Sequence, residues 1–166
     1  MKHLLICRHA KSSWKDLSLD DFDRPLNKRG KRNAPQMGKI LANHKVAPDL
    51  IVSSPARRAK KTAIVLAKEL HYPKKKIVYM REIYNAPAEK LIPCIHTFDD
   101  RYNRVIIVGH NTGFTTLVNI LGDLKIPNVP TCGIVSLAFK IESWKNLRKK
   151  EGKLNFFYYP KMIQEK

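Results

Sequence analysis

Cysteine and long apolar runs are both scarce in this chain of 166 residues. Its cysteines, Cys7, Cys94 and Cys132, form an odd and widely spaced set that does not suggest a disulfide framework. No two of them have the spacing of a zinc site, so we expect the three cysteines to behave as small buried apolar residues. No apolar run approaches the roughly 20 residues that cross a bilayer. The short run after Met1 leads straight into charge, unlike a signal peptide. We therefore expect a cytoplasmic protein without a membrane partner.

Acidic residues are also few, with 14 Asp and Glu against 32 Lys and Arg, which gives a formal net charge of +18. A basic surface can bind nucleic acid, and it can equally attract anionic substrates such as phosphates. The basic residues are scattered along the chain and are not interleaved with aromatic residues as in RNA-binding motifs. We therefore do not expect nucleic acid as the partner, and we interpret most of these charges as solvated.

The length fits one domain spanning 1–166, and we found no linker, internal repeat or low-complexity segment. Strand and helix patterns alternate, which favours an α/β fold: a three-layer sandwich with a mainly parallel sheet flanked by helices. The last two strands are expected to be antiparallel or to lie at a sheet edge. Predicted strands are 3–7, 49–53, 76–79, 104–109, 133–139 and 154–159; predicted helices are 27–44, 54–70, 86–95 and 110–121.

Histidines and arginines follow three of the predicted strands. Arg8 and His9 come after the first, Arg58 follows the second in the next helix, and His110 and Asn111 come after the fourth. Ligands of such sheets bind beyond the carboxyl ends of the strands, so these side chains should converge. Arginine suits bidentate phosphate contacts, a neutral histidine nitrogen can attack phosphorus, and a helix N-terminus after Asn111 would add N–H donors. This pattern predicts phosphoryl transfer.

Other phosphatase chemistries do not fit the sequence. A cysteine nucleophile requires Cys-x5-Arg, but the residues at that offset are Ser13, Asp100 and Ala138. Asp21-Phe22-Asp23 has the letters of an aspartate-nucleophile motif but lies in the long loop 11–26, so we interpret it as loop or capping chemistry. A P-loop is absent, and the segment 109–113 has the glycines of a nucleophile elbow without a central serine.

Three motifs give the chain a family resemblance. Arg8-His9-Ala10 is similar to an Arg-His-Gly motif, the segment 54–62 to Ser-Pro-x-x-Arg-Ala-x-x-Thr, and Val108-Gly109-His110-Asn111 to a second-histidine motif. In this order they resemble the histidine phosphatase superfamily, whose fold is phosphoglycerate mutase-like, and within it the short SixA-type phosphohistidine phosphatases. Ala10 departs from the usual glycine, and we expect an ordinary backbone there rather than positive φ.

The resemblance also implies roles. His9 would be the nucleophile and become phosphorylated, while Arg8, Arg58 and His110 would hold the phosphoryl group, with Asn111 beside them. Glu82, after the third strand, matches the carboxylate that protonates the leaving group in the wider superfamily. The imidazole of phosphohistidine leaves readily when its ring is protonated, so the alternative role of Glu82 is to position the substrate; both roles stay open. No metal or organic cofactor is expected.

The chain lacks the long insertions that cover small substrates in larger members of the superfamily. We therefore expect a monomer that removes the phosphoryl group from phosphohistidine on a protein, for which a histidine-phosphotransfer domain is one candidate. One alternative is a phosphatase of the same superfamily that acts on a small phosphomonoester. An alternative of another class is a basic module that binds nucleic acid or protein without catalysis.

Overall fold

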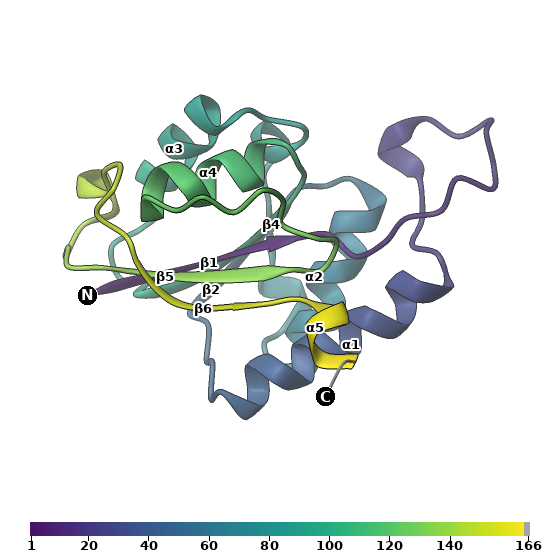
Figure 1. The fold of residues 1–166 in the computed structure, drawn as a ribbon, viewed down its shortest axis with the longest axis horizontal. Helices are drawn as coiled ribbons and strands as arrows, with labels where there is room; N and C mark the ends of the chain where they lie inside the picture. The colour runs from purple at the N-terminus through teal and green to yellow at the C-terminus, as the bar shows by residue number, and fades with distance from the viewer. Residues whose placement is uncertain (165–166) are drawn as a thin grey trace.

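The computed structural model describes residues 1–164, and a six-stranded sheet forms its middle layer (Figure 1). The order is β3-β2-β4-β1-β5-β6; β3, β2, β4 and β1 are parallel, and β5 is antiparallel to both of its neighbours. This confirms the mainly parallel α/β sheet with an antiparallel C-terminal pair. The strands are β1 (Lys2–Arg8), β2 (Leu50–Ser53), β3 (Val78–Tyr79), β4 (Arg104–Gly109), β5 (Ile134–Phe139) and β6 (Lys153–Tyr158).

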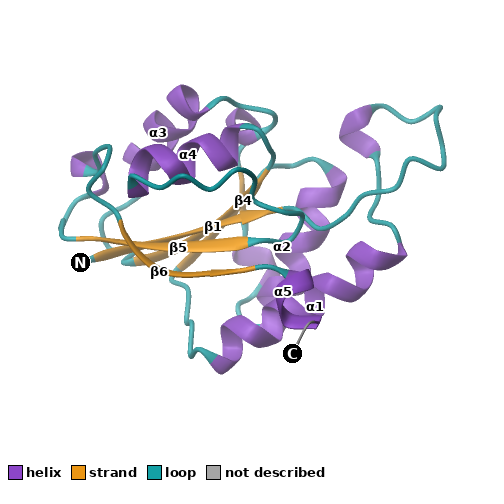
Figure 2. Cartoon of the chain, in the orientation of Figure 1, coloured by secondary structure: helices purple, strands orange, loops and turns teal. Residues whose placement is uncertain are grey.

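Helices cover both faces of the sheet. Figures 1 and 2 show α3 and α4 on one face and α1, α2 and the short α5 on the other. The three-layer arrangement follows from strands whose side chains are apolar on both faces. The helices are α1 (Lys28–Asn43), α2 (Arg57–Glu69), α3 (Ala88–His96), α4 (Gly113–Gly122) and α5 (Pro160–Gln164), with short 3-10 turns η1 (Asp21–Asp23), η2 (Lys74–Lys76), η3 (Arg81–Ile83) and η4 (Trp144–Asn146).

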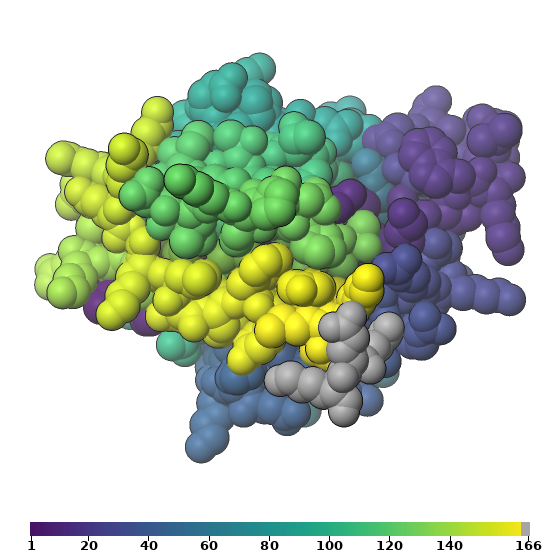
Figure 3. Space-filling model, viewed as in Figure 1, coloured from purple at the N-terminus to yellow at the C-terminus, as the bar shows by residue number. Residues whose placement is uncertain are grey.

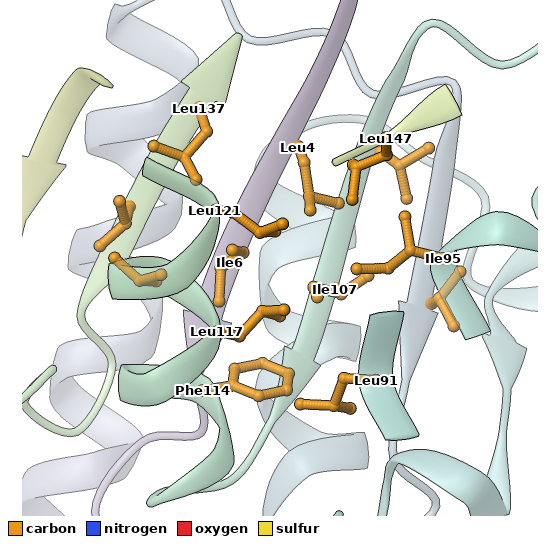
Figure 4. Close-up of a cluster of buried hydrophobic side chains, with 14 of the residues drawn as sticks. Leu4, Ile6, Leu91, Ile95, Ile107, Phe114, Leu117, Leu121, Leu137 and Leu147 are labelled. Carbon is orange, nitrogen blue, oxygen red and sulfur yellow. The ribbon is translucent and has the colours of Figure 1, made fainter. Parts of the chain in front are cut away.

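The two central strands bury alternate residues in two separate cores. In β1, Leu4 and Ile6 belong to the cluster under α3 and α4, with Phe114 and Leu117 (Figure 4), whereas Leu5 belongs to the cluster under α1 and α2. Each of these side chains is almost fully buried. These contacts hold β1 beside the parallel strand β4, so the carboxyl ends of both strands lie at the same edge of the sheet.

Several predicted boundaries are wrong, mostly at strand-to-helix turns. The second helix starts at Arg57 rather than Ser54, because Ala56 is still extended, with φ −55° and ψ 139°. The helices predicted from 86 and 110 start at Ala88 and Gly113. Short turns therefore separate β2 from α2 and β4 from α4. These turns contain the polar residues Ser54, His110 and Asn111. The predicted strand 76–79 shrinks to two residues, and the helix α5 was not predicted.

The loop from Lys11 to Leu26 leaves the carboxyl end of β1 and returns to the start of α1. It contains η1, is closed by a bridge between Ser12 and Leu26, and stands out as a lobe at one end of the molecule (Figure 3). Asn27 caps α1: its side-chain oxygen accepts a 2.8 Å hydrogen bond from the Gly30 N–H. Gly30 packs directly on the backbone carbonyl of Lys11, where a Cβ would collide.

We predict that Gly30→Ala destabilises the protein by about 1–3 kcal/mol, because the added methyl must displace the backbone at the base of the loop. Urea unfolding of the variant measures this loss. Gly122→Ala is the matched control, since the Cβ there meets only leucine side chains, at 3.0 Å and beyond, and these can adjust. An equal loss in both variants would contradict the proposed tight contact under the loop.

Candidate active site

The turns after β1, β2 and β4 meet at one edge of the sheet, because these strands are parallel and adjacent. They enclose an open pocket of about 300 Å³. Five of the six predicted site residues line it, and Glu82 does not. The lining consists of Arg8, His9, Lys11, Ser12, Trp14, Asp21, Arg24, Arg58, Asn85, His110, Asn111 and Thr131.

His9 is buried at the floor of this pocket, with 7 % of its surface exposed. Its Nδ1 lies 2.7 Å from the carbonyl oxygen of Ala10, and a carbonyl can only accept, so Nδ1 carries the proton. The lone pair of the neutral ring is therefore on Nε2, which accepts from Arg58 Nε at 3.3 Å. Burial lowers the pKa of His9 to about 4; the Ala10 contact opposes this shift, and the cations of Arg58 and Arg8 add to it.

Arg58 links the pocket together from the first turn of α2. It is 3 % exposed, whereas Arg57 beside it is exposed. Its Nη2 lies 3.3 Å from His110 Nδ1 and donates to Asp21 Oδ2 at 2.9 Å, and its Nη1 donates to the Asp21 carbonyl at 2.6 Å. The guanidinium thus lies between both histidines and one carboxylate.

His110 approaches His9 from the end of β4, with ring centroids 5.2 Å apart. Because Arg58 donates towards its Nδ1, the neutral ring carries its proton on Nε2, which donates to Ser54 Oγ at 2.8 Å. Burial is the main cause that lowers the pKa of His110 to about 3, followed by the proximity of His9 and Arg58. Both rings are therefore neutral at pH 7 in the unliganded protein.

Arg8 and Asn111 are both tied to the turn before β5. The Nη1 of Arg8 and the side-chain amide of Asn111 each donate to the Val129 carbonyl at 3.0 Å. The Asn111 oxygen accepts from Thr115 in α4, so both ends of its amide already have partners. The buried Nε of Arg8 has no partner among the described residues. An oxyanion in the pocket would supply one.

Asp21 is the carboxylate of the pocket, and it was not among the site residues predicted from the sequence. Its carboxylate accepts from Arg58, from Arg24 Nη2 at 3.1 Å and from the Tyr84 hydroxyl at 2.6 Å. Partial burial would raise its pKa, but the hydrogen bonds from Tyr84 and Arg58 outweigh this and hold the pKa well below its usual range. The pattern Asp21-Phe22-Asp23 could have indicated this residue, but because it lies in a loop it was interpreted as loop or capping chemistry.

Glu82 lies outside the pocket, on η3 after the edge strand β3. It is exposed and lines a neighbouring hollow with Glu89, Lys90 and Cys94. Asn85 lines both hollows, so the two adjoin. The structure therefore does not bring Glu82 together with His9, and its role as a proton donor stays a prediction.

Ala10 takes an ordinary backbone conformation, as expected, since it is not among the residues with positive φ. Its N–H donates to Thr62 Oγ1 at 3.0 Å, and that hydroxyl donates to the Arg58 carbonyl at 2.8 Å. The second motif therefore connects the ends of the neighbouring strands through hydrogen bonds. Ser54 bonds to His110, Thr62 bonds to Ala10, and Arg58 bonds to both histidines.

Among residues 1–164, no group of three or more His, Cys, Asp or Glu side chains is arranged to hold a metal ion. The positive charges that line the pocket are the guanidinium groups of Arg8, Arg24 and Arg58 and the ammonium group of Lys11. The same part of the chain contains no helix that is long and apolar enough to cross a membrane.

Comparison with known proteins agrees with this geometry. The family model described as histidine phosphatase superfamily (branch 1) matches residues 4–102. A crystal structure of a provisionally named phosphohistidine phosphatase SixA from Agrobacterium tumefaciens is 30 % identical, with TM-score 0.79, covering 96 % of this chain and 98 % of that one.

Two further relatives are more distant in sequence. The protein histidine phosphatase SixA complexed with tungstate is 20 % identical and shows the same fold, with TM-score 0.82 over 97 % of this chain and 99 % of that one. An uncharacterized chloroplastic protein of Arabidopsis thaliana is 29 % identical over 87 % of this chain and 69 % of its own length. With its fold, its three motifs and these matches, the chain belongs to the histidine phosphatase superfamily and is of the SixA type.

Proposed function

We propose that the protein is a metal-independent phosphatase that removes the phosphoryl group from phosphohistidine on a protein, through a phosphorylated His9. The observation that carries this proposal is the Nε2 lone pair of His9, which faces the buried guanidinium of Arg58 in an open pocket. A nucleophile beside fixed cations is the arrangement that phosphoryl transfer requires.

In the first step, the Nε2 lone pair of His9 forms a bond to phosphorus while the phosphorus–nitrogen bond of the substrate breaks. The bonding electrons leave with the substrate imidazole, which departs neutral if its other nitrogen was protonated. Arg8, Arg58 and His110 hold the phosphoryl oxygens, with the unpartnered Nε of Arg8 as one donor. Water then attacks phosphorus and releases inorganic phosphate and neutral His9.

The described lining of the pocket contains no carboxylic acid that could protonate a leaving oxygen, and this favours phosphohistidine as the substrate. Asp21 is the carboxylate among the described lining residues, and its low pKa keeps it ionised. An alkyl phosphate needs a proton on its leaving oxygen, whereas the imidazole of phosphohistidine leaves without one. A small phosphomonoester remains the second candidate, supported by Glu82 in the adjoining hollow.

A substrate panel tests the proposed function. We predict turnover of phosphohistidine above phosphoserine and sugar phosphates, unaffected by EDTA, and acid-labile labelling of the protein by a labelled phosphodonor. His9→Ala should reduce turnover by about a thousandfold or more and remove the label, because the nucleophile is gone. The exposed His71→Ala is the control. A preference for sugar phosphates would reject the substrate class, and labelling that persists in His9→Ala would reject the nucleophile.

The lowered pKa of His9 predicts an unusual pH dependence. The free enzyme should keep neutral His9 down to its pKa of about 4, so kcat/KM, corrected for substrate ionisation, should fall only near that pH rather than near 6.5. The contribution of His9 to the free energy of unfolding changes with pH in the same direction. The His9 ring binds its proton more readily in the unfolded chain, where its pKa is 6.5, than in the folded protein. The contribution is therefore fully present above pH 6.5 and is lost as the pH falls towards 4. NMR titration of the His9 ring checks this, and an ordinary midpoint near 6.5 would contradict the assigned environment.

The role of Glu82 is tested by Glu82→Gln. If it donates a proton, the variant should lose about a hundredfold on alkyl phosphates and little on phosphohistidine, whose leaving group needs no acid. Glu89→Gln, in the same hollow, is the matched control. Comparable losses on both substrates would leave Glu82 as a positioning residue and contradict its role as an acid.

A further inference from the structure

The loop beside the pocket exposes two large apolar side chains. Trp14 is 64 % exposed and Leu17 is 85 % exposed, the highest values among the large hydrophobic residues described. Trp14 is nevertheless held in place, because the buried guanidinium of Arg24 lies 3.5 Å from its ring centroid. Arg24 is fixed in turn by Asp21 and Ser12. A rigid, exposed tryptophan at the lip of a pocket is typical of an anchor for a binding partner.

A basic groove of about 500 Å³ lies on the other side of the same loop, between α1 and α2. Its lining has an apolar floor of Pro25, Leu26 and Ile64 and four cations, and it contains no carboxylate. These cations are exposed, and none forms an ion pair with a carboxylate within residues 1–164. They are Lys31, Arg57, Lys60 and Lys61.

The groove and the catalytic pocket are lined by residues that are consecutive in the chain. Arg57 lines the groove and Arg58 the pocket, and likewise Pro25 lines the groove and Arg24 the pocket. Trp14 lines the pocket itself. A macromolecule that inserts a phosphorylated side chain into the pocket would therefore lie against Trp14 and come near the groove, whereas a small phosphate ester would be held by the pocket alone.

We propose that the basic groove and the exposed apolar residues of the loop form a docking surface for an acidic face of the phosphorylated substrate protein, with an apolar side chain of that face against Trp14. This inference rests on the proposed function. Unpaired cations favour a partner with several carboxylates. The aliphatic floor of the groove contains no aromatic ring on which bases could stack, and the Arg24 guanidinium occupies one face of Trp14, which favours protein over nucleic acid.

The test uses free phosphohistidine and three phosphohistidyl peptides that carry four Glu, four Gln or four Lys around the same leucine. We predict that the wild type has a kcat/KM about tenfold higher for the Glu peptide than for the Gln peptide at low salt, and lower still for the Lys peptide. Charge reversal at Lys31, Lys60 and Lys61 (Lys→Glu at each) should remove this preference. The control reverses Lys39, Lys68 and Lys75, exposed lysines outside the groove, and changes the net charge equally.

Each outcome is decisive. Loss of the preference in the groove variant alone, with free phosphohistidine turned over as in the control variant, supports the docking surface. Equal effects in both variants, or no peptide preference in the wild type, would overturn it. Absence of phosphohistidine turnover in the wild type would instead reject the proposed function. Groove-dependent binding of oligo(dT) without a peptide preference would assign the groove to nucleic acid.

Tryptophan fluorescence tests the apolar contact separately. The sequence contains two tryptophans, Trp14 and the fully buried Trp144. Trp144→Phe therefore leaves Trp14 as the single tryptophan that emits. With His9→Ala to prevent turnover, the Glu peptide should shift the Trp14 emission to shorter wavelength, and replacing its leucine by serine should abolish the shift. Far-UV circular dichroism confirms that the variant is folded. An unchanged emission at saturating peptide would remove Trp14 from the proposed surface.

Discussion

The buried guanidinium of Arg58 is the group on which the rest of the site depends. It contacts both histidines, and its charge is compensated by Asp21, which reaches it from the loop rather than from the sheet. A buried charge that loses its partner is strongly destabilising. The order of the loop, the orientation of Arg58 and the state of both rings are therefore parts of one network.

That network also explains why the site suits an anion. Three guanidinium groups and Lys11 line the pocket beside two rings that burial holds neutral, and Asp21 is the one carboxylate in the described lining, so the pocket has more positive than negative charge. A phosphoryl group that enters this pocket meets guanidinium groups that are already held in place, and the Nε of Arg8 is a donor without another partner among the described residues. Its negative charge would also favour protonation of His110, which would then donate to a phosphoryl oxygen. Binding and proton uptake are thus coupled by the same short distances.

The sequence was sufficient to predict the residues that lie at strand ends. His9, Arg58 and His110 follow strongly apolar strands, and parallel neighbours bring such ends together whatever the exact strand order. Asp21 was not predictable in this way. Its position depends on a loop of sixteen residues that closes through Ser12, Leu26 and the tight contact at Gly30, and no local periodicity encodes such a closure. The helix starts were predicted too early because apolar spacing does not mark where a turn ends.

The place of Glu82 follows from the sheet order. β3, which precedes it, is the edge strand, and β2 and β4 separate it from β1, which carries His9. Tyr84 and Asn85 follow Glu82 at the border between the two hollows, and the Tyr84 hydroxyl is already bound to Asp21. A proton donor at the position of Glu82 would therefore act from the rim of the pocket, whereas a leaving group that needs no acid would require only the residues on the floor. Arg8, His9, Arg58 and His110 line the pocket and Glu82 lies outside it, so the proposed cleavage of phosphohistidine is the reaction that does not depend on Glu82.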